Sequence, residues 1–332
     1  MWLDVVDCNS ADEFIANLRL THPRWKSDTL EHEWLFRGMG DATWKLRPSA
    51  WRSAIHPKIR EFISSSKEFE NIMYKWGSSQ PPMDLSPEQR ETWNNLSEQT
   101  RRDRSLAFVS QQYFELHLLY DFWQIANEVG HQVDAPYWVA NHPIRWSDLV
   151  PPSIGMRDKF FKTILSATAQ HHGIPTRLLD WTFLPSIAAF FAAQNPSGSR
   201  IAVWALKRSA VASSRLNLFQ VPRASLPFLH AQSGLFIIDD WPYADFALTG
   251  EWPSHEDVLS DYCSRPDACV ALRGNVACKI TLPASMAPSV TEILWHERIS
   301  RAHLMPTLDC VSQTVLGAYE WRNPKSVFPR FW

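Results

Sequence analysis

The sequence predicts an α+β fold, and two observations carry that prediction. Strand-like segments occur on both sides of the chain's middle: "WLFRG" at 34–38 comes before it, and "RIAVWALK", "QSGLFIID" and "VACKITLP" follow residue 199. Between them, residues 55–156 are more polar and carry apolar side chains at helical spacing. Strands at both ends with helices between them indicate one α+β domain with a large helical insertion.

We expect one domain over all 332 residues. Its core comprises about 1–54 and 157–310, the helical insertion about 55–156, and a C-terminal extension 311–332. Near the start, Ser10 is a plausible N-cap with Glu13 three residues later, which predicts an amphipathic helix over 10–20. The segment "DATWKLRPSAWR" at 41–52 is expected to form a loop and a second extended piece.

Within the insertion, two stretches at 56–76 and 98–130 have helical periodicity, separated by a proline-rich segment. A further helix should end at His171 and His172, before Gly173 and Pro175. A strand "RLLDWT" at 177–182 and a helix "PSIAAFFAAQ" at 185–194 follow. The last expected helix lies around "TEILWHERIS" at 291–300.

Composition excludes several classes of function. The chain has 33 Lys plus Arg and 35 Asp plus Glu, so no overall field attracts nucleic acid or an anionic membrane. The acidic N-terminus does not resemble a secretory signal, and no apolar run reaches the roughly 20 residues that span a bilayer. We therefore expect a cytoplasmic protein that does not bind a membrane, and the same grounds of charge disfavour nucleic acid as a partner.

The five cysteines are odd in number and none forms a C-x-x-C pair. This spacing favours buried, reduced thiols over disulfides or a zinc ribbon. His171 and His172 are adjacent, and adjacent side chains on a helix do not converge on a metal. No metal is therefore expected, and a histidine that contacts a ligand or caps a carbonyl fits better.

Polar and chargeable residues stand in an unusually apolar stretch, "QHHGIPTRLLDWTFLPSIAAFFAAQ" at 170–194. Asp180 lies between Leu179 and Trp181, and a buried carboxylate needs a partner such as Arg37, Arg177 or a histidine. That pairing is compatible with a catalytic role.

Arg37 in "FRG" has two interpretations. It could pair with a carboxylate, either Asp180 or Glu33, at a strand end. It could also bind an anion, because a guanidinium grips phosphate oxygens in pairs and Gly38 allows close approach of the backbone. The charge cluster "RRDR" at 101–104 is expected to be a solvated helix face.

Four segments in the same order resemble the FRG domain family, which is named for its Phe-Arg-Gly motif. They are "WLFRGMGDATWKLRPSAWR" at 34–52, "AQHHGIPTRLLDWTFLPSIAAFFA" at 169–192, "AQSGLFII" at 231–238 and "ISRAHLMPTLD" at 299–309. The scattered, accessory character of that family implies a role in bacterial phage defence or a toxin system.

The order of elements also resembles the ADP-ribosyltransferase fold of the Arg-Ser-Glu type, which implies a mixed or antiparallel sheet. In that fold an Arg on the first strand holds the phosphates of NAD, a hydroxyl on the second supports the nicotinamide ribose, and a later Glu stabilises the oxocarbenium ion. By motif, Arg37 corresponds to the Arg and Thr182 to the hydroxyl. Gln232 or Ser233 stands in the region of the Glu, so the acid would come from elsewhere, Asp180 or Glu297.

Two hypotheses follow. In the first, the protein is an enzyme that cleaves the nicotinamide glycosidic bond of NAD, with Asp180 and Gln232 as catalytic candidates and an acceptor that the residues do not identify. Its ligand-binding candidates are Arg37, Gly38, His171, His172, Arg177 and Thr182. In the second, the protein is a non-catalytic module that senses a nucleotide or binds a partner, which the missing Glu favours.

Overall fold

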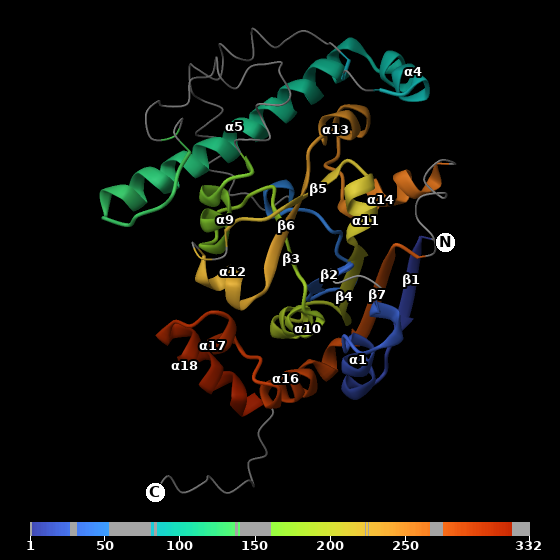
Figure 1. The fold of residues 1–332 in the computed structure, drawn as a ribbon. Coiled ribbons are helices and arrows are strands. Elements are labelled where there is room, and N and C mark those ends of the chain that lie inside the picture. Colours follow the sequence, from blue (N-terminus) through green and yellow to red (C-terminus); the bar gives the residue numbers. More distant parts are fainter. Residues whose placement is uncertain are drawn as a thin grey trace, which may run out of the picture.

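One mixed β-sheet lies at the centre of the computed structural model (Figure 1). The structure describes residues 2–26, 32–52, 81–82, 85–136, 139, 161–222, 224, 226–265 and 275–320. In these residues seven strands follow the order β1-β7-β4-β2-β3-β6-β5, with β1 parallel to β7 and all other neighbours antiparallel. The strands are β1 (Leu3–Asp7), β2 (Trp34–Met39), β3 (Leu179–Thr182), β4 (Arg200–Lys207), β5 (Leu216–Phe219), β6 (Gly234–Asp239) and β7 (Ala277–Pro283). The predicted α+β class is confirmed.

Helices surround this sheet and occupy most of the connections. In the described residues they are α1 (Ala11–Leu18), α4 (Pro87–Asn95), α5 (Glu98–Glu128), α9 (Ile164–His171), α10 (Pro185–Gln194), α11 (Arg208–Ser213), α12 (Pro227–Ala231), α13 (Tyr243–Thr249), α14 (His255–Ser264), α16 (Ala287–His296), α17 (Arg301–Leu304) and α18 (Leu308–Gly317). Short 3-10 turns lie at Pro23–Trp25, Ser49–Trp51, Ala284–Met286 and Ala318–Glu320.

The capping signal before α1 is confirmed. The Ser10 hydroxyl accepts the backbone N–H of Glu13, and the Glu13 carboxylate accepts the N–H of Asn9. The first bond satisfies an N–H group that the first helical turn leaves free, whereas the second goes to Asn9, one residue before the N-cap. The helix ends at His171 and Gln194 also agree with the sequence.

Other expectations differ from the structure. The second extended piece within 41–52 is wrong, because this segment is a loop that ends in the 3-10 turn Ser49–Trp51. The Asp41 carboxylate accepts both the N–H and the hydroxyl of Thr43, which closes the loop locally. Strands β1 and β5 were not predicted from their short, mixed sequences. The helix expected at 56–76 lies outside the described residues.

Two groups of helices share one face of the sheet. Helices α1, α10 and α16 pack on the strands β7, β4 and β2, where Phe36, Val203 and Ile280 are fully buried. At the other end of the same face, α5, α9 and α12 pack against Phe236 and Ile238 of β6. The opposite face is covered by α11 and α14. The face over β2 and β3 therefore lies between the two helix groups (Figure 1).

Helix α5 is the longest described helix and belongs to the predicted insertion. Polar and charged residues recur along it, and of the described helices none is both long and apolar enough to cross a membrane.

The charge cluster "RRDR" at the start of α5 is not wholly solvated. The Arg104 guanidinium donates to the carbonyls of Ala247 and Leu248 in α13, and Arg101 lies over the Trp93 ring. These contacts correct the expectation for "RRDR", since exposed carbonyls at a helix end attract a cation.

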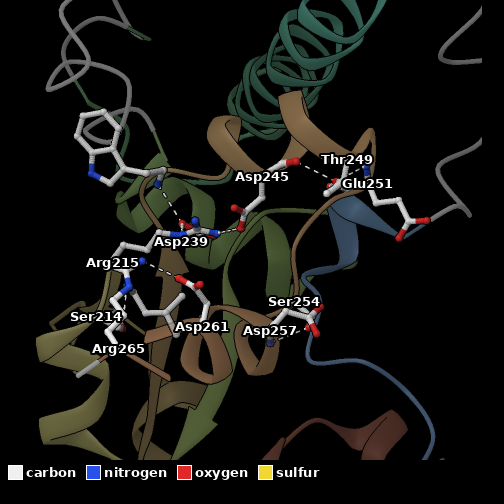
Figure 2. A network of polar contacts seen from close by, with 12 residues as sticks. Ser214, Arg215, Asp239, Asp245, Thr249, Glu251, Ser254, Asp257, Asp261 and Arg265 are labelled. Atoms are coloured by element: carbon white, nitrogen blue, oxygen red, sulfur yellow. Dashed lines mark hydrogen bonds and ion pairs between the residues drawn. The ribbon is translucent and has the colours of Figure 1, made fainter. Parts of the chain in front are cut away.

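A charged network joins β5, β6 and α13 at the sheet edge (Figure 2). Arg215 donates to both oxygens of Asp239, which is fully buried, and pairs with Asp245. Burial raises the pKa of the Asp239 carboxyl, and Arg215 opposes that rise. Such a pair is costly to break because one buried charge would remain without compensation.

Of the described thiols, Cys8 and Cys278 are buried as expected, whereas Cys263 and Cys310 are only half-buried. Cys8, Cys263, Cys278 and Cys310 form no disulfide, while Cys269 lies outside the described residues. Burial raises the pKa of Cys8 to about 11 and that of Cys278 to about 12. Both thiols are therefore protonated and unreactive at neutral pH.

Candidate functional site

A cavity of about 470 Å³ lies over strands β2 and β3, between α10 and the pair α9 and α12. Its volume falls in the range of about 300–1,000 Å³ that is usual for small-molecule sites. The residues that line this cavity come from segments far apart in the chain. They are Phe36, Arg37, Gly38, Met39, Gly40, Trp44, Arg52, Ala167, Gln170, His171, Asp180, Trp181, Thr182, Ala188, Phe191, Asn195, Leu226, Phe228, Leu229, Gln232, Phe236 and Met305.

Arg37 of β2 lines this cavity beside β3. By alternation, Arg37 lies on the opposite face of the sheet, with Leu35 and Met39. The two strands pair at a single described position, Phe36 with Thr182. Residues of that face, Met39 and Trp181, also line the cavity, and the Nη1 of Arg37 donates to the backbone carbonyl of Asp180 at 2.7 Å.

Arg37 also forms an ion pair with the Asp180 carboxylate, at 3.6 Å between Nη1 and Oδ2. The expected pairing of these residues is confirmed. The expected burial of Asp180 is wrong, because its side chain is 62% exposed while that of Arg37 is 15% exposed. Burial lowers the pKa of Arg37 to about 10 and Asp180 opposes this, so the guanidinium stays charged at neutral pH.

A chain of hydrogen bonds holds the Asp180 carboxylate in place. The side-chain amide of Gln170 donates to Asp180 Oδ1 at 2.6 Å. The carbonyl oxygen of that amide accepts the hydroxyl of Thr176, which in turn accepts the N–H of Leu178. These bonds fix the amide orientation of Gln170 and so direct its N–H at the carboxylate.

Thr182 and Gln232 meet where β3 ends and β6 begins. The Thr182 hydroxyl donates to the carbonyl of Gln232 at 2.7 Å and accepts the N–H of Leu184. The Gln232 amide donates to the carbonyl of Leu304 at 3.4 Å. Ser233 does not line the cavity and has a φ of 46°, in the left-handed region that a tight turn needs.

His171 lies in the cavity wall and stacks on Phe228, with 3.9 Å between the ring centres. Burial lowers its pKa, and repulsion from His172 adds to this effect. At neutral pH the ring is therefore uncharged. His172 is not among the lining residues and stacks on Phe122 of α5 instead.

Two of the expected ligand-binding residues have structural partners. Arg177 is buried and pairs with Glu115 of α5, with 2.8 Å between Nε and Oε2. Its guanidinium also lies over the Phe161 ring. Gly38 lines the cavity, but a Cβ on it would lie 2.0 Å from the carbonyl oxygen of Ala188. The close approach at Gly38 is therefore to α10, which limits its predicted role toward a ligand.

Sequence reasoning did not single out Arg52, Gln170 or Trp44, which also line the cavity. Arg52 closes the first matched segment at 34–52, and this position was the only signal for it. Gln170 contacts Asp180 and Thr176 only in the folded chain, and Trp44 is an exposed aromatic residue. Of the candidate acids, Glu297 pairs with Arg19 and does not line the cavity.

The charges in the cavity suit an anionic ligand. Of the lining residues, Arg37 and Arg52 are cationic and Asp180 is the carboxylate. In the part of the chain that the structure describes, no group of three His, Cys, Asp or Glu side chains could hold a metal ion. The site can therefore offer charged hydrogen-bond donors to an anion beside an aromatic wall.

A family model described as the FRG domain matches residues 32–200, about half of the chain. The chain belongs to the FRG domain family. The match covers β2, β3 and α10, together with α9 and the described part of the insertion. The two later segments at 231–238 and 299–309, which the sequence also suggested for an FRG domain, lie beyond the matched residues. Neither the curated proteins nor the solved structures include a match to this chain.

Proposed function

We propose that this FRG domain protein binds NAD in the cavity over β2 and β3 and cleaves its nicotinamide glycosidic bond. One observation carries the proposal: Arg37 of β2, Thr182 of β3 and Gln232, which lies in the turn before β6, correspond to the ADP-ribosyltransferase motifs and line one cavity. A site for a nucleotide needs a phosphate-binding group and a ribose-binding group close together, and this arrangement supports that assignment.

The residues present fit such a substrate in charge and shape. Arg37 has a buried Nε for which no partner is found among the described residues, in addition to the Nη1 that holds Asp180. Arg37 lines the cavity, so an anion bound there would also offset the charge of this buried guanidinium. The stacked rings of His171 and Phe228 offer a flat apolar surface for an aromatic ring.

Asp180 is the residue to which we assign the acid's role. Of the candidate acids, it is the one that lines the cavity, whereas Glu297 lies outside it. Its carboxylate would supply the negative charge that favours a developing oxocarbenium ion, a charge that Gln232 lacks. Thr182, with its hydroxyl fixed between Gln232 and Leu184, would position the substrate beside it.

The decisive experiment separates binding from cleavage. We expect Asp180→Asn to lower the rate of nicotinamide release by about 100-fold or more, as removal of one charge-stabilising group does. The same variant should still bind NAD in calorimetry. Glu297→Gln is the matched control and should release nicotinamide at the wild-type rate. If Asp180→Asn cleaves NAD normally, Asp180 is not the acid.

A non-catalytic nucleotide sensor is the second candidate, favoured by a specific observation. Arg37 and Gln170 already bind the Asp180 carboxylate. This carboxylate therefore lies beside the residue proposed to bind the phosphates, whereas catalysis would need it beside the nicotinamide ribose. A sensor would bind NAD tightly without releasing nicotinamide. A phage-defence or toxin role through NAD cleavage predicts that expression of the wild-type protein depletes cellular NAD and that expression of Asp180→Asn does not. A sensor predicts no depletion with either protein.

A further inference from the structure

The cavity contains a second arginine, Arg52, which lies 15 positions after Arg37 in the chain. Its Nε donates to the carbonyl of Arg47 at 2.9 Å. Its terminal amino groups make no hydrogen bond or ion pair with the described residues. The Nε of Arg52 is therefore fixed, and the residue itself lines the cavity.

A firm support holds Arg52 at this place. It directly follows the 3-10 turn Ser49–Trp51, whose Ala50 N–H donates to the carbonyl of Thr176 at 3.0 Å. The indole N–H of Trp51 donates to the buried Glu115 carboxylate of α5, and its ring stacks on Trp252 with 5.0 Å between centres. The turn is thus bound to both the strand side and the insertion.

The two arginines act on the same space. Repulsion from Arg52 contributes to the lowered pKa of Arg37. Burial lowers the pKa of Arg52, and attraction to Asp180 opposes this. Two cations and one carboxylate line the same cavity, and together they have a net positive charge. The Asp180 carboxylate occupies the place of a counter-ion that a stronger anion could displace.

We propose that Arg52 is a second anion-binding residue, which together with Arg37 holds a diphosphate group while Asp180 is the internal counter-ion between them. Two guanidinium groups from separate segments match two linked phosphates better than one, since each can form paired hydrogen bonds to its own phosphate. The inference rests on the proposed nucleotide site and adds to it the part of the ligand that the site selects.

Calorimetric titration with inorganic pyrophosphate and orthophosphate tests this. We expect pyrophosphate to bind the wild-type protein more tightly than orthophosphate. Arg52→Ala should weaken pyrophosphate binding by about 10- to 100-fold, as loss of hydrogen bonds to a charged group does, and orthophosphate binding much less. Arg52→Lys keeps the charge but not the fork and should lie between. Asp180→Asn should tighten pyrophosphate binding, because it removes the competing carboxylate.

Arg265→Ala is the matched control, since Arg265 pairs with Asp261 at the surface and does not line the cavity. It should bind pyrophosphate like the wild type. The inference is overturned if Arg52→Ala binds pyrophosphate unchanged, or if wild-type protein binds none. A thermal midpoint near that of wild type shows that each variant is folded.

The outcomes for NAD keep the two proposals apart. If NAD binding depends on Arg37 and not on Arg52, the proposed function stands and this inference fails. If ADP-ribose and pyrophosphate need both arginines but NAD is never cleaved, the inference stands and the proposed cleavage fails.

Discussion

At Arg37, strand alternation and charge impose opposite demands. Alternation directs the side chain into an apolar layer with Leu35 and Met39, where a charge is unfavourable. Asp180 of the neighbouring strand β3 resolves the conflict, because its carbonyl accepts a hydrogen bond from the guanidinium and its carboxylate forms an ion pair with it. The charge is thus partly buried, compensated by one residue and placed in a cavity.

The charge of Arg37 also affects His255, which lies at the start of α14. It is fully buried, and neither ring nitrogen has a partner among the described residues. Burial lowers its pKa to about 3, and repulsion from Arg37 and Arg215 adds to this effect. The folded protein therefore keeps this ring neutral.

This predicts a pH dependence of stability. A histidine in the unfolded chain has a pKa near about 6.5, so between that value and about 3 only the unfolded state binds the proton. The free energy of unfolding should fall as the pH drops through this window, by up to about 1.4 kcal/mol per pH unit from this residue. Urea unfolding from pH 7 to 4 measures it.

The matched variants are His255→Leu and His296→Leu, of which the second removes an exposed histidine. His255→Leu should have the shallower slope of unfolding free energy against pH, whatever its stability at pH 7. Equal slopes in His255→Leu and the wild type would contradict the prediction.

At the scale of elements, the contact of β2 with α10 fixes one wall of the cavity. Gly38 allows this contact, because a Cβ there would lie 2.0 Å from the carbonyl oxygen of Ala188 and 2.6 Å from the nitrogen of Ala192. Both are backbone atoms of α10, so no side-chain rotation can relieve the overlap. The FRG motif therefore combines a charged group for the cavity with a glycine for helix packing.

Gly38→Ala should destabilise the protein by about 1–3 kcal/mol or more, because α10 must move away from β2. Chemical denaturation measures the loss. Gly317→Ala is the control, because Gly317 ends α18 and a Cβ added to it would have no atom within 4 Å. Alanine favours helices, so the stability of this control should be unchanged or rise by up to about 1 kcal/mol. A Gly38→Ala protein as stable as the wild type would show that α10 is not tightly fixed.

At the scale of the whole molecule, α5 is part of the core. Val109, Leu116 and Leu119 of α5 form one apolar cluster with Leu165 of α9 and Phe236 of β6. Glu115 adds the buried ion pair with Arg177. The helical insertion predicted at 55–156 is therefore bound, at α5, to the strands that carry the site, and its boundaries stay a prediction.

Native-state hydrogen exchange tests this view. Leu116→Ala should lower the opening free energy of amides in both α5 and β6 by about the same amount, roughly 2–5 kcal/mol, because the two unfold as one unit. Ile125→Ala, on the exposed side of α5, should change both by about 0.5 kcal/mol or less. A loss confined to α5 would indicate a separable lid instead.

Local signals in the sequence determined most of the elements around the site. The Ser10 cap, the glycine and proline after His171 and the short apolar runs of β2, β4, β6 and β7 specify their segments, because each depends on neighbours in the chain. The pairing of Arg37 with Asp180 was also predictable, since a charge in an apolar strand needs compensation.

Only the tertiary structure decided which polar residues share the cavity. From their positions in the sequence, Arg177, His172 and Asp180 were equally good candidates for the site. In the structure, α5 provides partners for Arg177 and His172, whereas the side chain of Asp180 is exposed. Arg52 joins the site through a turn held by distant contacts. Local patterns determine strands and helices, whereas the packing of segments far apart in the chain determines which charges are buried in pairs and which face a ligand.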